Sequence, residues 1–201
     1  MWLAILGAGT LMAAKPRLSR TRVSAITDEL ASTQSEAVRL AREFGFEGVE
    51  LRNVPQTGKS FATLSEPELK RWAAELASNK LKVSALHVPA GTNASPAVEI
   101  LGARGVWDAT MAGAWTPGPD WQQAWPKLPR SRITSVRVPA ASLDRENPRH
   151  LGWKGILEML QKDGYAGNLV VETGVVETGA PPSDAAREAI RELIHLIGQI
   201  A

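Results

Sequence analysis

Three acidic residues stand in or just after short apolar runs. Glu50 lies within residues 48–51, Glu172 ends the run 169–172, and Asp108 follows Val106 and Trp107. A carboxylate that ends a buried strand is costly unless it is paired. Glu50 is near enough in sequence to pair with Arg52, and Asp108 can simply cap a turn. Grouped with a histidine, such carboxylates are able to transfer protons or bind a divalent cation.

The segments that would position these residues alternate between strands and helices. Alternating or continuous apolar runs predict strands at 22–27, 48–51, 81–86, 105–108, 132–138 and 169–172. Helical spacing of apolar residues predicts helices after Ser32 or Thr33, after Ser65, and over 97–101, 150–160 and 183–197. Residues 113–129 contain several glycine and proline breaks and are expected to be mostly loop. Strand–helix alternation of this kind predicts an α/β fold with a parallel sheet.

The bulk composition excludes several classes of protein. The 201 residues fit one domain, and 44% of them are hydrophobic, enough for a sizeable core. The formal net charge is only +2 and blocks of like charge are absent, so composition gives no support to nucleic-acid binding. The chain has no cysteine, which excludes disulfides, thiolate metal sites and a cysteine nucleophile.

The N-terminal segment differs from the rest of the chain. Residues 2–14 carry no charge and are followed by Lys15, Arg17 and Arg20. A run of this length is typical of the apolar part of an export signal and is too short to span a bilayer. We therefore separate residues 1–20, a degenerate signal or an N-terminal extension, from a domain over 21–201. The protein is expected to be cytoplasmic as written, or periplasmic if this segment still directs export.

Six segments taken together resemble one known family. They are ITDEL (26–30), FGFEGVELRNV (44–54), LSEPELKRWAAELASNKLKVS (64–84), VWDA (106–109), AWPKLPRSRITSVRV (124–138) and LGWKGILEMLQKDGYAGNLVVET (151–173). Their order and spacing are similar to those of the sugar phosphate isomerase/epimerase family of xylose-isomerase-like TIM barrels. The resemblance implies an incomplete barrel, or an open parallel sheet of about six strands with outer helices. It also implies that the family's fourth and fifth strands are missing, with a junction near residues 86–92.

The resemblance implies a metal-assisted isomerase or epimerase that acts on a sugar or polyol. Members bind a divalent cation (Mn²⁺, Mg²⁺, Co²⁺ or Zn²⁺) with two glutamates, an aspartate and a histidine. Asp108 and Glu172 match two of these ligands, and Glu172 would also transfer the proton. Arg137 stands near the place of the family's histidine, and guanidinium is a poor metal ligand. We expect Glu50, His87, Trp107 and Arg137 to contact the substrate.

Two other functions remain open at this stage. With two of four expected ligands unidentified, the chain could be a degenerate barrel that binds a ligand without catalysis. Abasic-site nucleases share the superfamily, although they use many histidines and this chain has three. A barrel that lacks strands would also leave sheet edges unpaired, which favours self-association.

Overall fold

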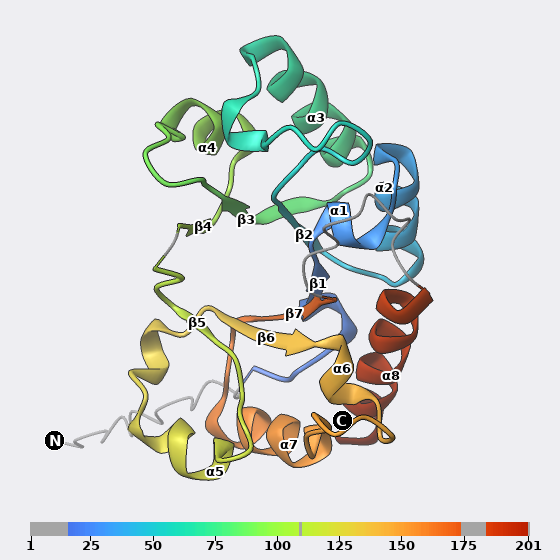
Figure 1. Ribbon diagram of the computed structural model, residues 1–201, viewed down its shortest axis with the longest axis vertical. Coiled ribbons are helices and arrows are strands. Elements are labelled where there is room, and N and C mark those ends of the chain that lie inside the picture. The colour runs from blue at the N-terminus through green and yellow to red at the C-terminus, as the bar shows by residue number, and fades with distance from the viewer. Residues whose placement is uncertain (1–15, 109, 174–183, 201) are drawn as a thin grey trace, which may run out of the picture.

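The computed structural model describes residues 16–108, 110–173 and 184–200, which form two parallel sheets wrapped by helices (Figure 1). One sheet contains, in spatial order, β1 (Val23–Ala25), β7 (Asn168–Glu172), β6 (Ser135–Pro139) and β5 (Ala114–Trp115). The other contains β2 (Gly48–Leu51), β3 (Lys82–His87) and β4 (Val106–Trp107). A parallel bridge between Ile26 and Glu50 links the two sheets. The expected α/β fold with parallel strands is therefore confirmed.

Helices connect the strands and lie on the outer side of the sheets (Figure 1). The α-helices are α1 (Thr27–Leu30), α2 (Gln34–Glu43), α3 (Glu66–Ser78), α4 (Ser95–Leu101), α5 (Trp121–Ala124), α6 (Ala140–Leu143), α7 (Trp153–Asp163) and α8 (Asp184–Ile200). Short 3₁₀ turns occur at Arg20–Arg22, Phe61–Thr63, Trp125–Lys127 and Arg130–Arg132. The last helix, α8, packs against both α6 and α7.

Local sequence signals explain where the longer helices begin. Thr33 caps α2, because its hydroxyl accepts a hydrogen bond from the backbone N–H of Glu36 at 3.2 Å. At the start of α3 the Glu68 carboxylate accepts from the backbone N–H of Ser65 at 2.8 Å and from its hydroxyl at 2.5 Å. These contacts confirm both predicted helix starts.

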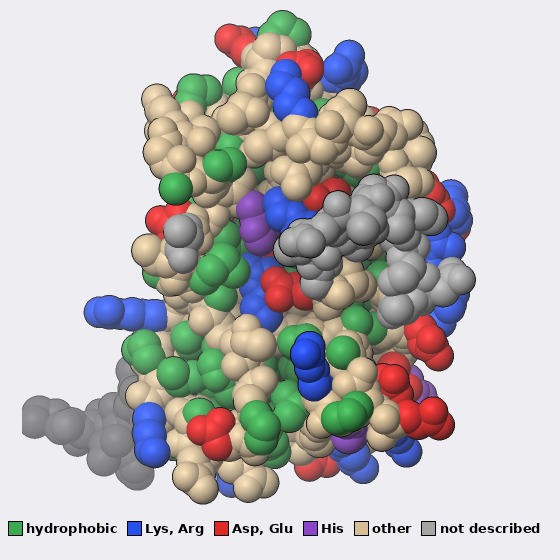
Figure 2. All heavy atoms as spheres, in the orientation of Figure 1, with side chains coloured by type: hydrophobic (Ala, Val, Ile, Leu, Met, Phe, Trp, Pro, Cys, Tyr) green, Lys and Arg blue, Asp and Glu red, His purple; other side chains and the backbone are tan. Residues whose placement is uncertain are grey.

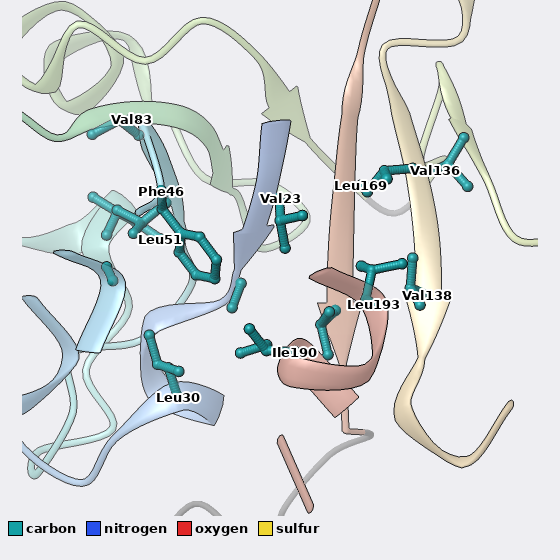
Figure 3. Close-up of a cluster of buried hydrophobic side chains, with 14 of the residues drawn as sticks. Val23, Leu30, Phe46, Leu51, Val83, Val136, Val138, Leu169, Ile190 and Leu193 are labelled. Carbon is teal, nitrogen blue, oxygen red and sulfur yellow. The ribbon is translucent and has the colours of Figure 1, made fainter. Parts of the chain in front are cut away.

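The two faces of each strand differ in chemistry. Outward-facing residues such as Val23, Val136, Val138 and Leu169 join the hydrophobic core with residues of the helices, including Ile190 of α8 (Figure 3). Successive side chains of a strand point to opposite faces, so the residues between them face the other way. That inner face carries polar residues, among them Ser24, Glu50, Ser135 and Arg137, all of them buried. The folded sheets therefore enclose a polar interior.

One expectation about the middle of the chain is wrong. The region expected to be mostly loop contains the short strand β5, the helix α5 and the 3₁₀ turn Trp125–Lys127. Gly113 allows the backbone before β5 to approach Arg132 closely. A Cβ at position 113 would lie 2.9 Å from the carbonyl oxygen of Arg132. A two-residue strand has no periodicity that the sequence could reveal. Within the described part of the chain, no pairing joins β4 to β5.

The N-terminal prediction lies mostly outside the described residues, which begin at Pro16. Leu18 is buried, and its backbone N–H donates to the side-chain oxygen of Gln161 at 2.6 Å, which fixes the entry to the domain against α7. In the ranges that the structure describes, no helix combines the length and apolar character needed to cross a membrane.

Candidate functional site

The carboxyl ends of the parallel strands bring five of the predicted site residues together. Glu50 comes from β2, His87 from β3, Trp107 from β4, Arg137 from β6 and Glu172 from β7. Parallel strands end at the same edge, and this edge is where α/β proteins usually place their ligands. Residues far apart in the sequence thus form one connected cluster, because Glu50 and Glu172 share Arg137.

Glu50 is the most enclosed member of the cluster, with 1% of its side chain exposed. Its Oε2 lies 2.6 Å from Nη1 of Arg137 and 2.9 Å from Nε2 of His87. Its Oε1 accepts from the indole N–H of Trp107 at 3.0 Å. Burial alone would raise the pKa of Glu50, but the bond to His87, the charge of Arg137 and the Trp107 N–H together lower it. Glu50 is therefore held in its ionised form.

Glu172 shares the same arginine in a more open position. Its Oε1 lies 3.0 Å from Nη1 of Arg137, and 27% of its side chain is exposed. Burial raises the pKa of Glu172; the charge of Arg137 lowers it, and the nearby Glu29 and Glu50 raise it further. The net shift is upward, so the two carboxylates on one guanidinium are moved in opposite directions. Glu172 is thus the carboxylate of the pair that holds a proton more readily.

Arg137 also contacts an aromatic ring. Its guanidinium carbon lies 5.0 Å from the centroid of the Trp107 ring, close enough for a cation–π contact. Trp107 therefore holds Glu50 through its N–H and Arg137 through its face. This double role agrees with its position in the cluster and with its burial, since only 5% of it is exposed.

A second polar network borders the cluster and includes Glu29, which is not among the site residues expected from the sequence. Glu29 is buried in α1, shortly after β1; it accepts from Nη1 of Arg52 at 2.8 Å and from the backbone N–H of Thr173 at 2.8 Å. Arg52 also contacts Asp28, with 3.0 Å between Nη2 and Oδ2. The only sequence signal for Glu29 is an acidic pair directly after a strand. The sequence suggested that Arg52 could pair with Glu50. Arg52 instead pairs with Asp28 and Glu29 of this network.

Asp108 is placed differently from the other predicted residues. Its carboxylate is exposed, and Oδ1 accepts from the backbone N–H of Thr110 at 2.8 Å and from its hydroxyl at 2.6 Å. This is the turn-capping role that the sequence left open for Asp108. The residue still lines a shallow hollow of about 390 Å³ together with Arg52, His87 and Trp107. Figure 2 shows a histidine beside basic and acidic side chains near the middle of the viewed face.

The described side chains do not fit the metal site that the family resemblance implies. Both glutamates of the cluster bind Nη1 of Arg137, and Nε2 of His87 faces Glu50. Among the described residues, no three His, Asp or Glu side chains are arranged to hold one metal ion. A guanidinium stays protonated and cannot act as a ligand, so Arg137 supplies the positive charge at this point itself.

The sequence matches no protein-family model, and the search of curated proteins finds no matching protein. The arrangement of the described residues therefore carries the functional argument.

Proposed function

We propose that the chain is an acid–base isomerase or epimerase of a sugar or polyol, built on an incomplete barrel. The barrel form is supported by the strand order, which follows the chain from β1 to β4 and from β5 to β7, and by the bridge between Ile26, directly after β1, and Glu50 of β2. Among the described residues, the break in strand order lies between β4 and β5, whereas the resemblance places the missing strands near residues 86–92, where β3 pairs directly with β4. Closed barrels of this class place their chemistry at the carboxyl ends of the strands.

The observation that carries the proposal is the shared guanidinium of Arg137. Two carboxylates on one arginine have their pKa values moved apart, downward for Glu50 and upward for Glu172. A pair of this kind assigns different roles to two like groups. Glu172 would remove and return a proton at carbon, while Glu50 stays ionised and holds Arg137 and His87 in place. The positive charge of Arg137 would stabilise the oxyanion that develops when a proton leaves the carbon next to a carbonyl.

A metal-assisted reaction stays a prediction from the family resemblance. No step in this proposal passes through a metal, because the described ligands do not fit one. The non-catalytic alternative is a degenerate barrel that binds a sugar-like ligand, and it is supported by the resemblance, which places Arg137 near the position of the family's histidine. The nuclease alternative gains no support, since His150 and His195 are exposed and are not part of the cluster.

Solvent-deuterium exchange tests the proposal across a whole class of candidate substrates. The protein is incubated in D₂O with a panel of aldoses, ketoses and their phosphates, and loss of carbon-bound protium is followed by NMR. We expect exchange at the carbon next to the carbonyl for one substrate class. Glu172→Gln should slow it by about 10²–10⁴-fold, the usual contribution of a general base.

Glu158→Gln is the matched control, because Glu158 is an exposed glutamate on α7. Its exchange rate should equal that of the wild type. A folded wild-type protein that exchanges no protium in any member of the panel, yet binds one of them, would favour the non-catalytic alternative.

A further inference from the structure

A larger cavity opens at the other end of the strands. It has a volume of about 980 Å³, and its wall includes Thr21, Gly48, Lys82, Gly105 and Asn168, which lie at or just before the starts of strands. Because the strands are parallel, their starts share one edge, opposite to the edge that carries Glu172. Glu50 and Trp107 also line this cavity, so it reaches inward as far as the cluster.

Small residues on the inner face of the strands create this space. Ser24, Ser84 and Ser135 line the cavity from β1, β3 and β6. The Ser24 hydroxyl donates to the carbonyl of Gly48 at 3.1 Å, and that of Ser84 donates to the carbonyl of Val49 at 2.9 Å. Ser135 is different: its Oγ is buried and has no hydrogen-bond partner among the described residues.

Two residues further along β6, Arg137 also has buried side-chain atoms without a hydrogen-bond partner among the described residues. Its Nε and Nη2 are buried and, within the described part of the chain, without a partner, while Nη1 serves both glutamates. Alternate residues of a strand share a face, so Ser135 and Arg137 point to the same interior. Buried polar groups without partners destabilise the folded state until a ligand or a water pairs with them. Arg137 itself is not part of the cavity wall, so the hydroxyl of Ser135 is the unpartnered buried donor that the wall offers to a ligand.

The rim of the cavity carries a surplus of positive charge. Its cationic side chains outnumber its carboxylates. Arg130 is paired with Asp163, with 2.7 Å between Nη1 and Oδ2, and Arg22 donates to the carbonyl of Ala166. Lys82 and Arg104 are exposed at the rim. Glu47 and Glu50 also line the cavity, but a net excess of positive charge on a concave surface still concentrates anionic ligands.

We propose that this cavity is a second binding site, for a small molecule that carries an oxyanion and hydroxyl groups. The rim charges of Lys82 and Arg104 attract the anion, and the unpartnered hydroxyl of Ser135 donates to it. The ligand's hydroxyl groups pair with the serines of the inner wall. The Ser135 hydroxyl is buried in this structure, so binding includes a small shift of the side chains over it. This site does not depend on the acid–base reaction proposed for Glu172.

Isothermal titration calorimetry at constant ionic strength tests the site with four probes: inorganic phosphate, a hexose 6-phosphate, a hexonate and the free hexose. We expect the anionic sugars to bind and the free hexose not to bind at the same concentration. Tighter binding of the phosphate ester or of the hexonate identifies the oxyanion as phosphate or carboxylate. Equal binding of the free hexose, or no binding of any probe, would overturn the proposal.

Three variants locate the binding. The double substitution Lys82→Gln with Arg104→Gln should weaken binding at least tenfold. The control pair Arg71→Gln with Lys127→Gln removes the same charge from exposed positions that do not line the cavity, and it should bind like the wild type. Ser135→Ala should also weaken binding about tenfold while the melting temperature of the free protein stays equal or rises, because an unpartnered buried hydroxyl is removed. Equal losses in the rim pair and the control pair would mean that only net charge matters.

Discussion

Arg137 and Glu50 form an ion pair in which each side chain is only 1% exposed, with 2.6 Å between Nη1 and Oε2. The two residues lie 87 positions apart in the sequence, on β6 and β2. The pair therefore joins strands from the two different sheets. It places a positive charge at the centre of the cluster, and the other contacts of the cluster are arranged around it.

Removal of this arginine should strongly destabilise the fold. Arg137→Met leaves Glu50 buried without its cation, and loss of one partner of a buried pair costs about 3–5 kcal/mol. Urea denaturation measures the free energy of unfolding. Arg39→Met is the matched control, because Arg39 pairs with Glu43 at 2.6 Å with both side chains 55% exposed. An exposed pair contributes about 0–1 kcal/mol, so similar losses in both variants would contradict the role given to Arg137.

The stability of the protein should depend on pH in two opposite ways. Glu50 has a pKa lowered from its ordinary 4.5. The contribution of Glu50 to the free energy of unfolding is therefore present above pH 4.5. It is lost as the pH falls through the pKa that Glu50 has in the folded state. Glu172 has a pKa raised from the ordinary 4.5, so the folded state binds more protons than the unfolded state above that pH. The stabilising contribution of protonated Glu172 is therefore lost as the pH rises through the pKa that Glu172 has in the folded state.

The substitution Glu172→Gln removes the pH-dependent contribution of Glu172 and leaves that of Glu50. From pH 4 to 8 the wild type should lose stability relative to this variant as the pH rises, and urea titrations at each pH measure the difference. The Glu158→Gln control should give a constant difference across the range, because Glu158 is exposed on α7. A wild type that gains stability relative to Glu172→Gln as the pH rises would show that the pKa of Glu172 is shifted downward.

Arg137→His should convert the cluster into a metal site if the family resemblance is correct. The substitution replaces a permanent cation by a neutral imidazole beside Glu50 and Glu172, which are then free to act as ligands. A metal that binds only the folded state raises the melting temperature, by an amount equivalent to about 2.7 kcal/mol at a concentration of 100 times Kd.

Thermal melting with EDTA and then with Mn²⁺ or Co²⁺ checks this expectation. We expect a rise for Arg137→His and none for the wild type. The double variant with Glu172→Gln should lose the rise. A metal-dependent rise in the wild type that Glu172→Gln abolishes would instead show that the native cluster binds a metal.

The ion pair between Arg52 and Glu29 should show clear energetic coupling. Glu29 has only 4% of its side chain exposed and lies 2.8 Å from Nη1 of Arg52. A double-mutant cycle with Arg52→Met and Glu29→Gln should give an interaction energy of about 0.5–3 kcal/mol. The exposed pair of Arg39 and Glu43 serves as the reference cycle, with an expected value of about 0.3–0.5 kcal/mol. Coupling no larger than this reference would mean that the network does not hold α1 to the end of β2.

The sequence by itself determined the local elements and the class of fold. The start of α3 was predictable because Ser65 and Glu68 bond to each other within one helical turn. Strand β2 was found at its observed bounds, Gly48–Leu51, because its apolar run is bounded by turn residues. Alternation of such strands with helices was enough to predict parallel pairing. β5 escaped prediction, since its pairing with β6 depends on the close approach of Gly113 to Arg132.

Only the tertiary structure decided which of the candidate residues act together. Glu50 has Arg52 two positions away, yet it pairs with the distant Arg137, while Arg52 pairs with Asp28 and Glu29. Asp108 follows Trp107 directly, but Trp107 enters the cluster and Asp108 caps an exposed turn. The reason is physical: a buried carboxylate must take the donors that the meeting strand ends supply, and the packing of the sheets sets which donors those are.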